Sequence, residues 1–124
     1  MRFLGIDYGE KRIGLAISDE DGKIAFPYGV VGSFSKIISL AKKEKINKII
    51  IGLPISFSGQ ESAQALKIRR FAEALQKKVK LPIEFENEVL TTKIASYGSK
   101  RDKIDASSAA IILQSYLDKN NSKL

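Results

Sequence analysis

The sequence predicts an α/β domain in which a five-stranded mixed sheet, with three antiparallel strands and then parallel strands, carries helices on both faces. Two observations support this fold class. The chain opens with three short strand-like runs separated by glycine-containing turns, a pattern typical of consecutive antiparallel strands. Amphipathic helical segments then alternate with two more strand-like runs, which indicates parallel strands joined by right-handed crossovers.

The opening runs have the alternation and the turn residues expected of strands. Gly9 allows the first turn, and Pro27 makes the third run suitable for an edge or a bend. Asp7 stands at the end of the first run, although aspartate is a poor strand former and is costly to bury without a partner. The predicted strands are Arg2–Ile6, Arg12–Ser18 and Lys23–Val31.

The later elements follow from helical and strand periodicity. Ser58 and Glu61 form a capping-box pattern, which predicts that the second helix begins just after Ser58. One face of that helix is apolar, through Ala65, Ile68, Ala72, Leu75 and Val79. The other predicted elements are a helix over Ser33–Lys45, a strand over Lys48–Leu53, a strand over Leu81–Glu88, a short helix over Thr91–Ser96, a basic loop over Tyr97–Lys103 and a helix over Ile104–Leu117.

Length and composition limit the class of protein. With 124 residues and 44% hydrophobic content, we expect one domain over residues 1–118 and a flexible tail over 119–124. No apolar stretch approaches the ~18 residues of a membrane helix, and the first residues lack a signal-peptide pattern, so we expect a cytoplasmic protein without a membrane partner. The absence of Cys and His leaves carboxylates, Lys, Tyr, Ser and Thr for any chemistry.

The charge balance favours an acidic polymer as partner. Twenty-one Lys and Arg against 14 Asp and Glu give a net charge of +7, and the pI is about 9.6. Many lysine-rich soluble proteins bind no nucleic acid, so charge alone leaves this question open.

Three acids far apart in the sequence are expected at one edge of the predicted sheet. Asp7 and Glu88 end strands, and Asp105 lies at the start of the last helix. Converging carboxylates suit Mg²⁺ or Mn²⁺, because these hard cations prefer oxygen ligands. Each acid also has a structural alternative, since Asp7 could stabilise the turn, Glu88 could be a surface charge and Asp105 could favour a helix N-terminus.

An ordered set of motifs along nearly the whole chain resembles the YqgF family. The resemblance implies an RNase H-like fold and a nuclease, described either as a Holliday junction resolvase or as a nuclease for the precursor of 16S ribosomal RNA. The motifs are Asp7-Tyr8-Gly9, Lys11-Arg12-Ile13-Gly14, Gly52-Leu53-Pro54 with Gly59, Arg69-Arg70-Phe71, Glu88-Val89-Leu90-Thr91-Thr92, and Lys103-Ile104-Asp105 followed by Ala109 and Ile111-Ile112-Leu113.

The family's three catalytic, metal-binding acids fall on Asp7, Glu88 and Asp105, the acids that the fold argument had selected. The chain departs from the family pattern on both sides of Glu88, where Asn87 and Val89 replace an acid and an arginine. Ser58 likewise replaces an acid before the loop glycine. These departures bear on substrate affinity more than on metal binding.

Basic residues near the predicted site could neutralise the phosphates on either side of the scissile bond. The candidates are Lys11, Arg12, Arg69, Arg70, Lys100, Arg101 and Lys103. Tyr8 and Tyr97 could stack on a base, although aromatic residues at such positions more often pack against the core.

The sequence and the resemblance together predict a nuclease that uses two Mg²⁺ or Mn²⁺ ions and processes the 5′ end of pre-16S rRNA, with ribosomal particles as a further partner. Symmetric cleavage of a DNA junction is the alternative and needs a two-fold dimer, so both a monomer and a homodimer stay open. A catalytically silent assembly factor on the same fold is the third reading. An ATPase related to actin and the sugar kinases is disfavoured, because those proteins bind ATP between two domains.

Overall fold

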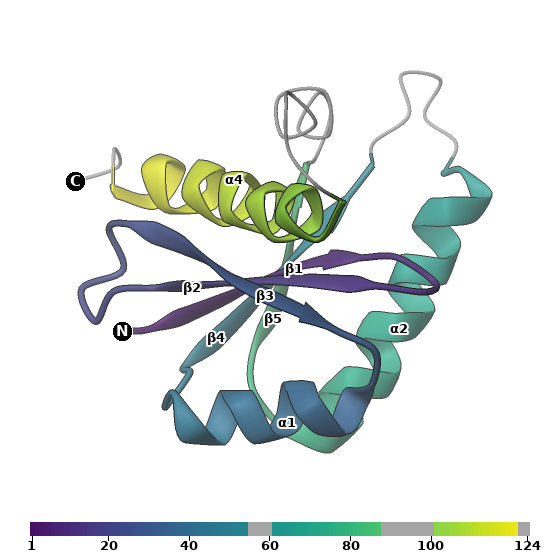
Figure 1. The fold of residues 1–124 in the computed structure, drawn as a ribbon, viewed down its shortest axis with the longest axis horizontal. Coiled ribbons are helices and arrows are strands. Elements are labelled where there is room, and N and C mark those ends of the chain that lie inside the picture. The colour runs from purple at the N-terminus through teal and green to yellow at the C-terminus, as the bar shows by residue number, and fades with distance from the viewer. Residues whose placement is uncertain (55–60, 88–100, 122–124) are drawn as a thin grey trace.

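The structure, a computed structural model, describes residues 1–54, 61–87 and 101–121, with the backbone alone for 101–105. The short helix expected over Thr91–Ser96 and residues 122–124 of the expected tail therefore lie outside it. The elements (Figure 1) are β1 (Phe3–Tyr8), β2 (Ile13–Ser18), β3 (Ala25–Val31), α1 (Phe34–Lys43), β4 (Lys48–Leu53), α2 (Ala63–Val79), β5 (Ile83–Asn87) and α4 (Arg101–Asn121).

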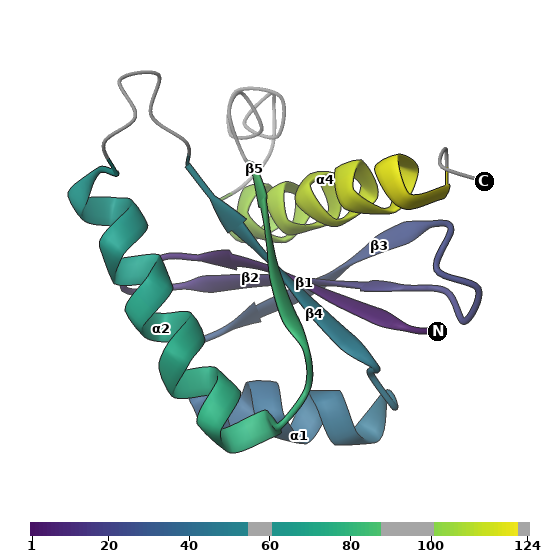
Figure 2. The same cartoon turned by 180° about the vertical axis from the view of Figure 1, so that it is seen from behind.

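The five strands form one mixed sheet, as predicted. Their order is β3-β2-β1-β4-β5, with β1, β2 and β3 antiparallel and with β1, β4 and β5 parallel. Helices α1 and α2 cover one face of the sheet and α4 covers the other (Figures 1 and 2). The fold class expected from the order of elements is thereby confirmed.

The two faces of the sheet carry separate hydrophobic cores, and β1 contributes to both. Leu4 and Ile6 are fully buried in the core beneath α1 and α2, whereas Phe3 packs in the core beneath α4. Because side chains alternate along a strand, Asp7 shares the α4 face with Phe3 and Gly5.

The predicted capping box of the second helix is wrong. Helix α2 begins at Ala63, and the hydroxyl of Ser62 accepts a hydrogen bond from the Ala65 amide at 3.2 Å. Ser58 lies outside the described residues, and Glu61 is engaged in an ion pair with Arg69. The apolar face is confirmed, with Phe71 as an additional buried member.

The last helix is longer than predicted at both ends. Arg101 and Lys103 belong to its first turn and not to a loop, and the helix continues through Asn121, beyond the expected domain end at 118. Its final turn has tertiary partners, because Lys119 pairs with Glu86 at 2.7 Å and the Asn121 amide donates to a carbonyl at 3.3 Å. The periodicity of a local segment cannot predict contacts between residues so far apart in the sequence.

The first helix is slightly shorter than predicted, since α1 ends at Lys43 and not at Lys45. Lys45 adopts a left-handed conformation with φ of 54°, which ends the helical path. Ala41 then accepts a backbone hydrogen bond from Ile46 at 2.9 Å, and the chain turns into β4.

Candidate active site

Asp7 lies inside the strand ladder and not in the turn that follows it. It pairs with Gly14 of β2, and Tyr8 continues the ladder opposite Ile13. The hairpin narrows immediately afterwards, because a Cβ at Gly9 would lie 2.6 Å from the Arg12 carbonyl oxygen. The side chain of Asp7 is half-buried, and its backbone is paired with β2, while β4 flanks β1 on the other side up to Ile6.

Helix α4 crosses β1 at very close range. A Cβ built on Gly5 would lie 2.7 Å from the Cβ of Leu113 and 3.0 Å from the carbonyl oxygen of Ala109. Two residues earlier on the strand, the rings of Phe3 and Tyr116 have centroids 5.8 Å apart. As β1 advances, its contacts therefore move toward the N-terminus of α4, so the strand and the helix are antiparallel.

This crossing determines which part of α4 lies beside Asp7. Two strand residues advance about 6.8 Å, the rise of four to five helical residues at about 1.5 Å each. One such step leads from Tyr116 to the Ala109–Leu113 contact, and a second step leads from there to the turn that holds Asp105 and Ala106. By this spacing we expect the turn of α4 that contains Asp105 to lie level with Asp7.

Strand β5 brings two more carboxylates to the face covered by α4. Glu86 is only 5% exposed and accepts hydrogen bonds from Ser115 at 2.9 Å and from Lys119 at 2.7 Å. Sequence reasoning singled out Glu88 and missed Glu86. The signal was the period of two in the segment Glu84-Phe85-Glu86-Asn87-Glu88, which indicates acids on one face of a strand.

Glu84 belongs to the same polar contact between β5 and α4. It forms an ion pair with Lys48 at 3.0 Å and accepts a hydrogen bond from the Tyr116 hydroxyl. Burial alone would lower the pKa of Lys48, but its interactions with Tyr116 and Glu84 outweigh burial and raise the pKa. These bonds fix β5, and with it the residue that precedes Glu88, against α4.

The turn between β1 and β2 presents cations near Asp7 and is attached to α2. Lys11 is exposed and Arg12 is half-buried in this turn. Glu10 forms an ion pair with Lys67 of α2, and this hydrogen-bonded partner holds the pKa of Glu10 below its ordinary value. The pair links the turn to the helix on the opposite face of the sheet.

The other predicted phosphate-binding residues are distributed over two regions. Arg69 and Arg70 are exposed on α2, where Arg69 pairs with Glu61 and lies 5.1 Å from the centre of the Phe85 ring. Arg101 and Lys103 lie in the first turn of α4, while Glu88, Lys100 and Tyr97 lie outside the described residues.

Tyr8 packs against the core, in line with the more ordinary of its two predicted roles. Its ring centre lies 4.5 Å from that of Phe71. This contact occupies the ring on the α2 side of the sheet, away from the face that carries Asp7.

The arrangement combines a fixed carboxylate with the beginning of a helix. The N-terminal end of α4 carries a partial positive charge, which favours anions such as phosphate near Asp7. Among the residues whose side chains are described, no group of three or more acids forms a metal site. Glu88 and the side chain of Asp105 are outside that set, so the predicted triad stays a prediction.

Comparison with known proteins places this chain among nucleases. The family model for RuvX, described as a Holliday junction resolvase, matches residues 1–119. A protein of Maridesulfovibrio salexigens, named as a candidate pre-16S rRNA nuclease, is 38% identical over 94% of this chain and 98% of its own length. Similarly named proteins of Sulfurihydrogenibium and Rickettsia bellii are 40% and 41% identical, each over 95% of this chain and over 90% and 86% of their own lengths.

Two solved structures share the fold. The RuvC of Thermus thermophilus aligns with a TM-score of 0.62 and 13% identity, covering 98% of this chain and 97% of its own. The same protein in complex with a Holliday junction substrate aligns with a TM-score of 0.64 and 13% identity, covering 98% and 96%. At this identity the likeness concerns the fold alone.

Among the described residues, no helix is long and apolar enough to cross a membrane.

Proposed function

Because this chain belongs to the RuvX family, we propose that it is a metal-dependent nuclease whose active site lies between the end of β1 and the start of α4. Asp7, Glu88 and Asp105 are the proposed metal ligands and catalytic residues. Nuclease activity, and with it hydrolysis of phosphodiester bonds, is supported by the family and by the names of relatives that span nearly the whole chain.

The observation that carries this proposal is the crossing of α4 over β1 at Gly5. From the spacing of its contacts, it would bring the turn of Asp105 level with Asp7, although 97 residues separate them. Glu84 and Glu86 face α4 from β5, and a continuation of their alternation would bring Glu88 to the same face. Three segments distant in the sequence would thus supply one carboxylate each.

The available donors suit a hard divalent cation. The chain contains neither His nor Cys, so an ion at this site would be held by carboxylate oxygens, water and substrate phosphate, as Mg²⁺ and Mn²⁺ prefer. A pair of such ions would supply an activated water and stabilise the leaving oxygen. Asp7 would be the ligand common to both ions, because its pairing with β2 fixes its backbone. Arg12 and Lys11 would bind phosphates beside it.

We propose pre-16S rRNA as the substrate, since the similar proteins of three genera carry that name. The chain would then act in the cytoplasm, near or on ribosomal particles. A four-way DNA junction is the second candidate, because the matching family model is described as a Holliday junction resolvase. That reaction would need a homodimer, whereas trimming an RNA end would not.

The test is parallel cleavage of end-labelled pre-16S rRNA and a four-way DNA junction with Mn²⁺, by the wild type and by Asp7→Asn. Asp21→Asn is the matched control, because it removes the same charge from an exposed turn between β2 and β3. We expect cleavage of the RNA by the wild type and the control, and none by Asp7→Asn. The thermal midpoint should also rise with Mn²⁺ in the wild type and the control only.

The outcomes separate the readings. Cleavage of the junction alone would transfer the assignment to branched DNA. Binding of RNA without any cleavage would favour the silent assembly factor. A midpoint that Mn²⁺ raises equally in the wild type and Asp7→Asn would refute the proposed ligand.

A further inference from the structure

Strand β5 is an edge of the sheet that has neither the proline nor the bulge found at the opposite edge. The opposite edge, β3, contains Pro27, and its register with β2 shifts between Leu15 and Ala16. Proline and bulges are devices by which proteins prevent strands from adding to an edge. The five residues of β5 include no Pro, Gly or Lys, and no bulge interrupts their pairing with β4.

The backbone register shows which groups of β5 face outward. The amide of Ile49 donates to the carbonyl of Pro82 at 2.9 Å, which fixes the phase of the parallel ladder. In that phase the amides of Glu84 and Glu86 point to β4, while those of Ile83 and Phe85 point away from the sheet. Among the described residues, no strand lies on that outer side.

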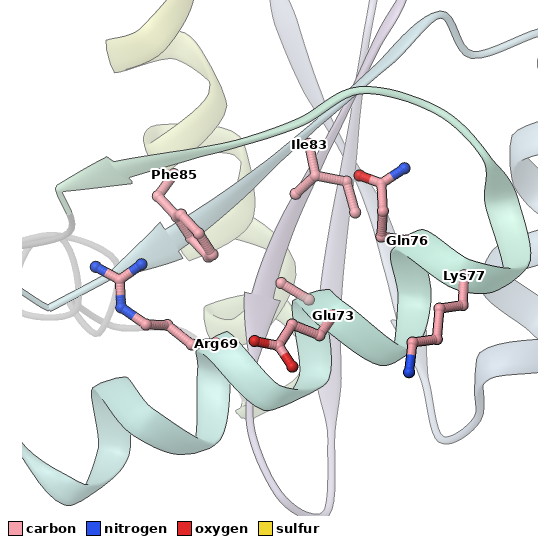
Figure 3. A pocket seen from close by; sticks show the side chains of 7 residues that line it. Arg69, Glu73, Gln76, Lys77, Ile83 and Phe85 are labelled. Atoms are coloured by element: carbon pink, nitrogen blue, oxygen red, sulfur yellow. The ribbon is translucent and has the colours of Figure 1, made fainter.

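A groove lies beside this edge, between β5 and α2 (Figure 3). Its volume is about 450 Å³, and Ala72, Ile83 and Phe85 give it an apolar floor. Ile83 and Phe85 are alternate residues of one strand, so their spacing of about 6.8 Å matches two alternate side chains of an added strand. Ile83 and Phe85 therefore supply both the apolar side chains of the groove and the outward amides, with the same spacing along β5.

We propose that the β5 edge binds an extended peptide as an additional strand, with apolar side chains at two alternate positions in the groove and an acidic side chain next to Lys77. Lys77 is exposed at the Ile83 end of the groove, and within the described part of the chain it forms no ion pair. Arg69, at the Phe85 end, already pairs with Glu61. The net charge of +7 further favours an acidic partner.

Two other occupants fit less well. A nucleic acid strand would bring its phosphates close to Glu73 and Glu61 on the α2 side, where Arg69 is already neutralised. A second copy of the chain, paired antiparallel about Phe85, would place Glu84 opposite Glu86 of its partner on each side of the axis. Like charges directly opposite each other destabilise a strand pair.

The test uses the full chain and two peptides of identical composition. Asp-Thr-Val-Thr-Val-Thr-Asp has alternating valines and reads the same in both directions, so it fits a parallel or an antiparallel strand. Asp-Thr-Thr-Val-Val-Thr-Asp places the valines on opposite faces and is the control. Binding is measured by NMR titration, and hydrogen exchange is followed at the individual β5 amides.

We expect the alternating peptide to bind at least tenfold more tightly than the control peptide. At saturation it should slow exchange at Ile83 and Phe85 at least tenfold and leave Glu84 and Glu86 unchanged, because those amides are already bonded to β4. Lys77→Glu should weaken binding about fivefold. Lys43→Glu, at the end of α1, is the matched control and should not weaken it.

Three results would overturn the proposal. These are the absence of binding, equal binding of the two peptides, and binding without slower exchange at Ile83 and Phe85. A seven-nucleotide uridine RNA that slows the same two amides at lower concentration than the peptide would show a nucleic acid site instead. None of these measurements depends on nuclease activity, so the two proposals can fail independently.

Discussion

Replacing Gly5 by alanine tests whether the close approach of α4 to β1 forms the candidate site. The added methyl group would lie 2.7 Å from the Cβ of Leu113 and 3.0 Å from the carbonyl oxygen of Ala109. Neither atom can rotate away, because one belongs to the helix backbone and the other is attached to it. The helix must therefore shift, and overpacking of this kind typically costs about 1–3 kcal/mol.

The assay is thermal and urea unfolding of Gly5→Ala with and without Mn²⁺. At roughly 4 °C per kcal/mol for a domain of this size, the thermal midpoint should fall by roughly 4–12 °C. The increase that Mn²⁺ produces should also shrink, because Asp105 moves with the helix. Gly32→Ala is the control, since no atom of another described residue, apart from the two chain neighbours, lies within 4 Å of the new methyl group and alanine there restricts the unfolded chain.

The reasoning would be refuted if Gly5→Ala matched the wild type both in stability and in its response to Mn²⁺. A loss of stability with an unchanged metal response would confirm the steric contact but separate it from the metal site. The control should be as stable as the wild type or up to about 1 kcal/mol more stable.

Two further changes test local contacts. Ser62→Ala should lower the unfolding free energy by about 1 kcal/mol in urea titration, because it removes the α2 cap, whereas Ser33→Ala should have little effect because its side chain makes no capping bond. Glu10→Gln should be less stable than the wild type at neutral pH. Lys67 lowers the folded-state pKa of Glu10 below 4.5, so the pair's contribution is present above that value and is lost as pH falls through the folded pKa. The difference between the two proteins should therefore disappear in acid, and a difference that persists there would contradict the ion-pair explanation.

Local patterns predicted the fold well because they reflect burial. Alternation of apolar and polar residues predicted the strands, and helical spacing of apolar residues predicted the apolar face of α2. The predicted ends of helices are wrong where residues make contacts outside their own local segment. The capping-box pattern includes Glu61, which instead pairs with Arg69, and the last turn of α4 contains Lys119, which contacts Glu86 on β5. No local window contains both members of the second pair.

The sequence singles out Asp7 for a different reason. Asp7 is an acid in a strand, where propensity disfavours it, and such local conflicts often mark a function. Glu86 is also an acid in a strand, but it lies outside the family motif, which Glu88 completes. Its burial depends on hydrogen bonds from Ser115 and Lys119 of α4, which lie far from it in the sequence.

The two proposed sites, the nuclease site and the peptide groove, lie on opposite faces of the sheet. On the α4 face, the site requires small residues at the crossing, and Gly5 and Ala109 meet where a larger side chain would separate the helix from the strand. Asp105 continues the same helix, so the contact that stabilises the fold also sets the position of a proposed ligand. Metal binding and helix packing should therefore be coupled. The β5 edge and its groove lie on the α2 face, and a peptide bound there would leave that packing unchanged.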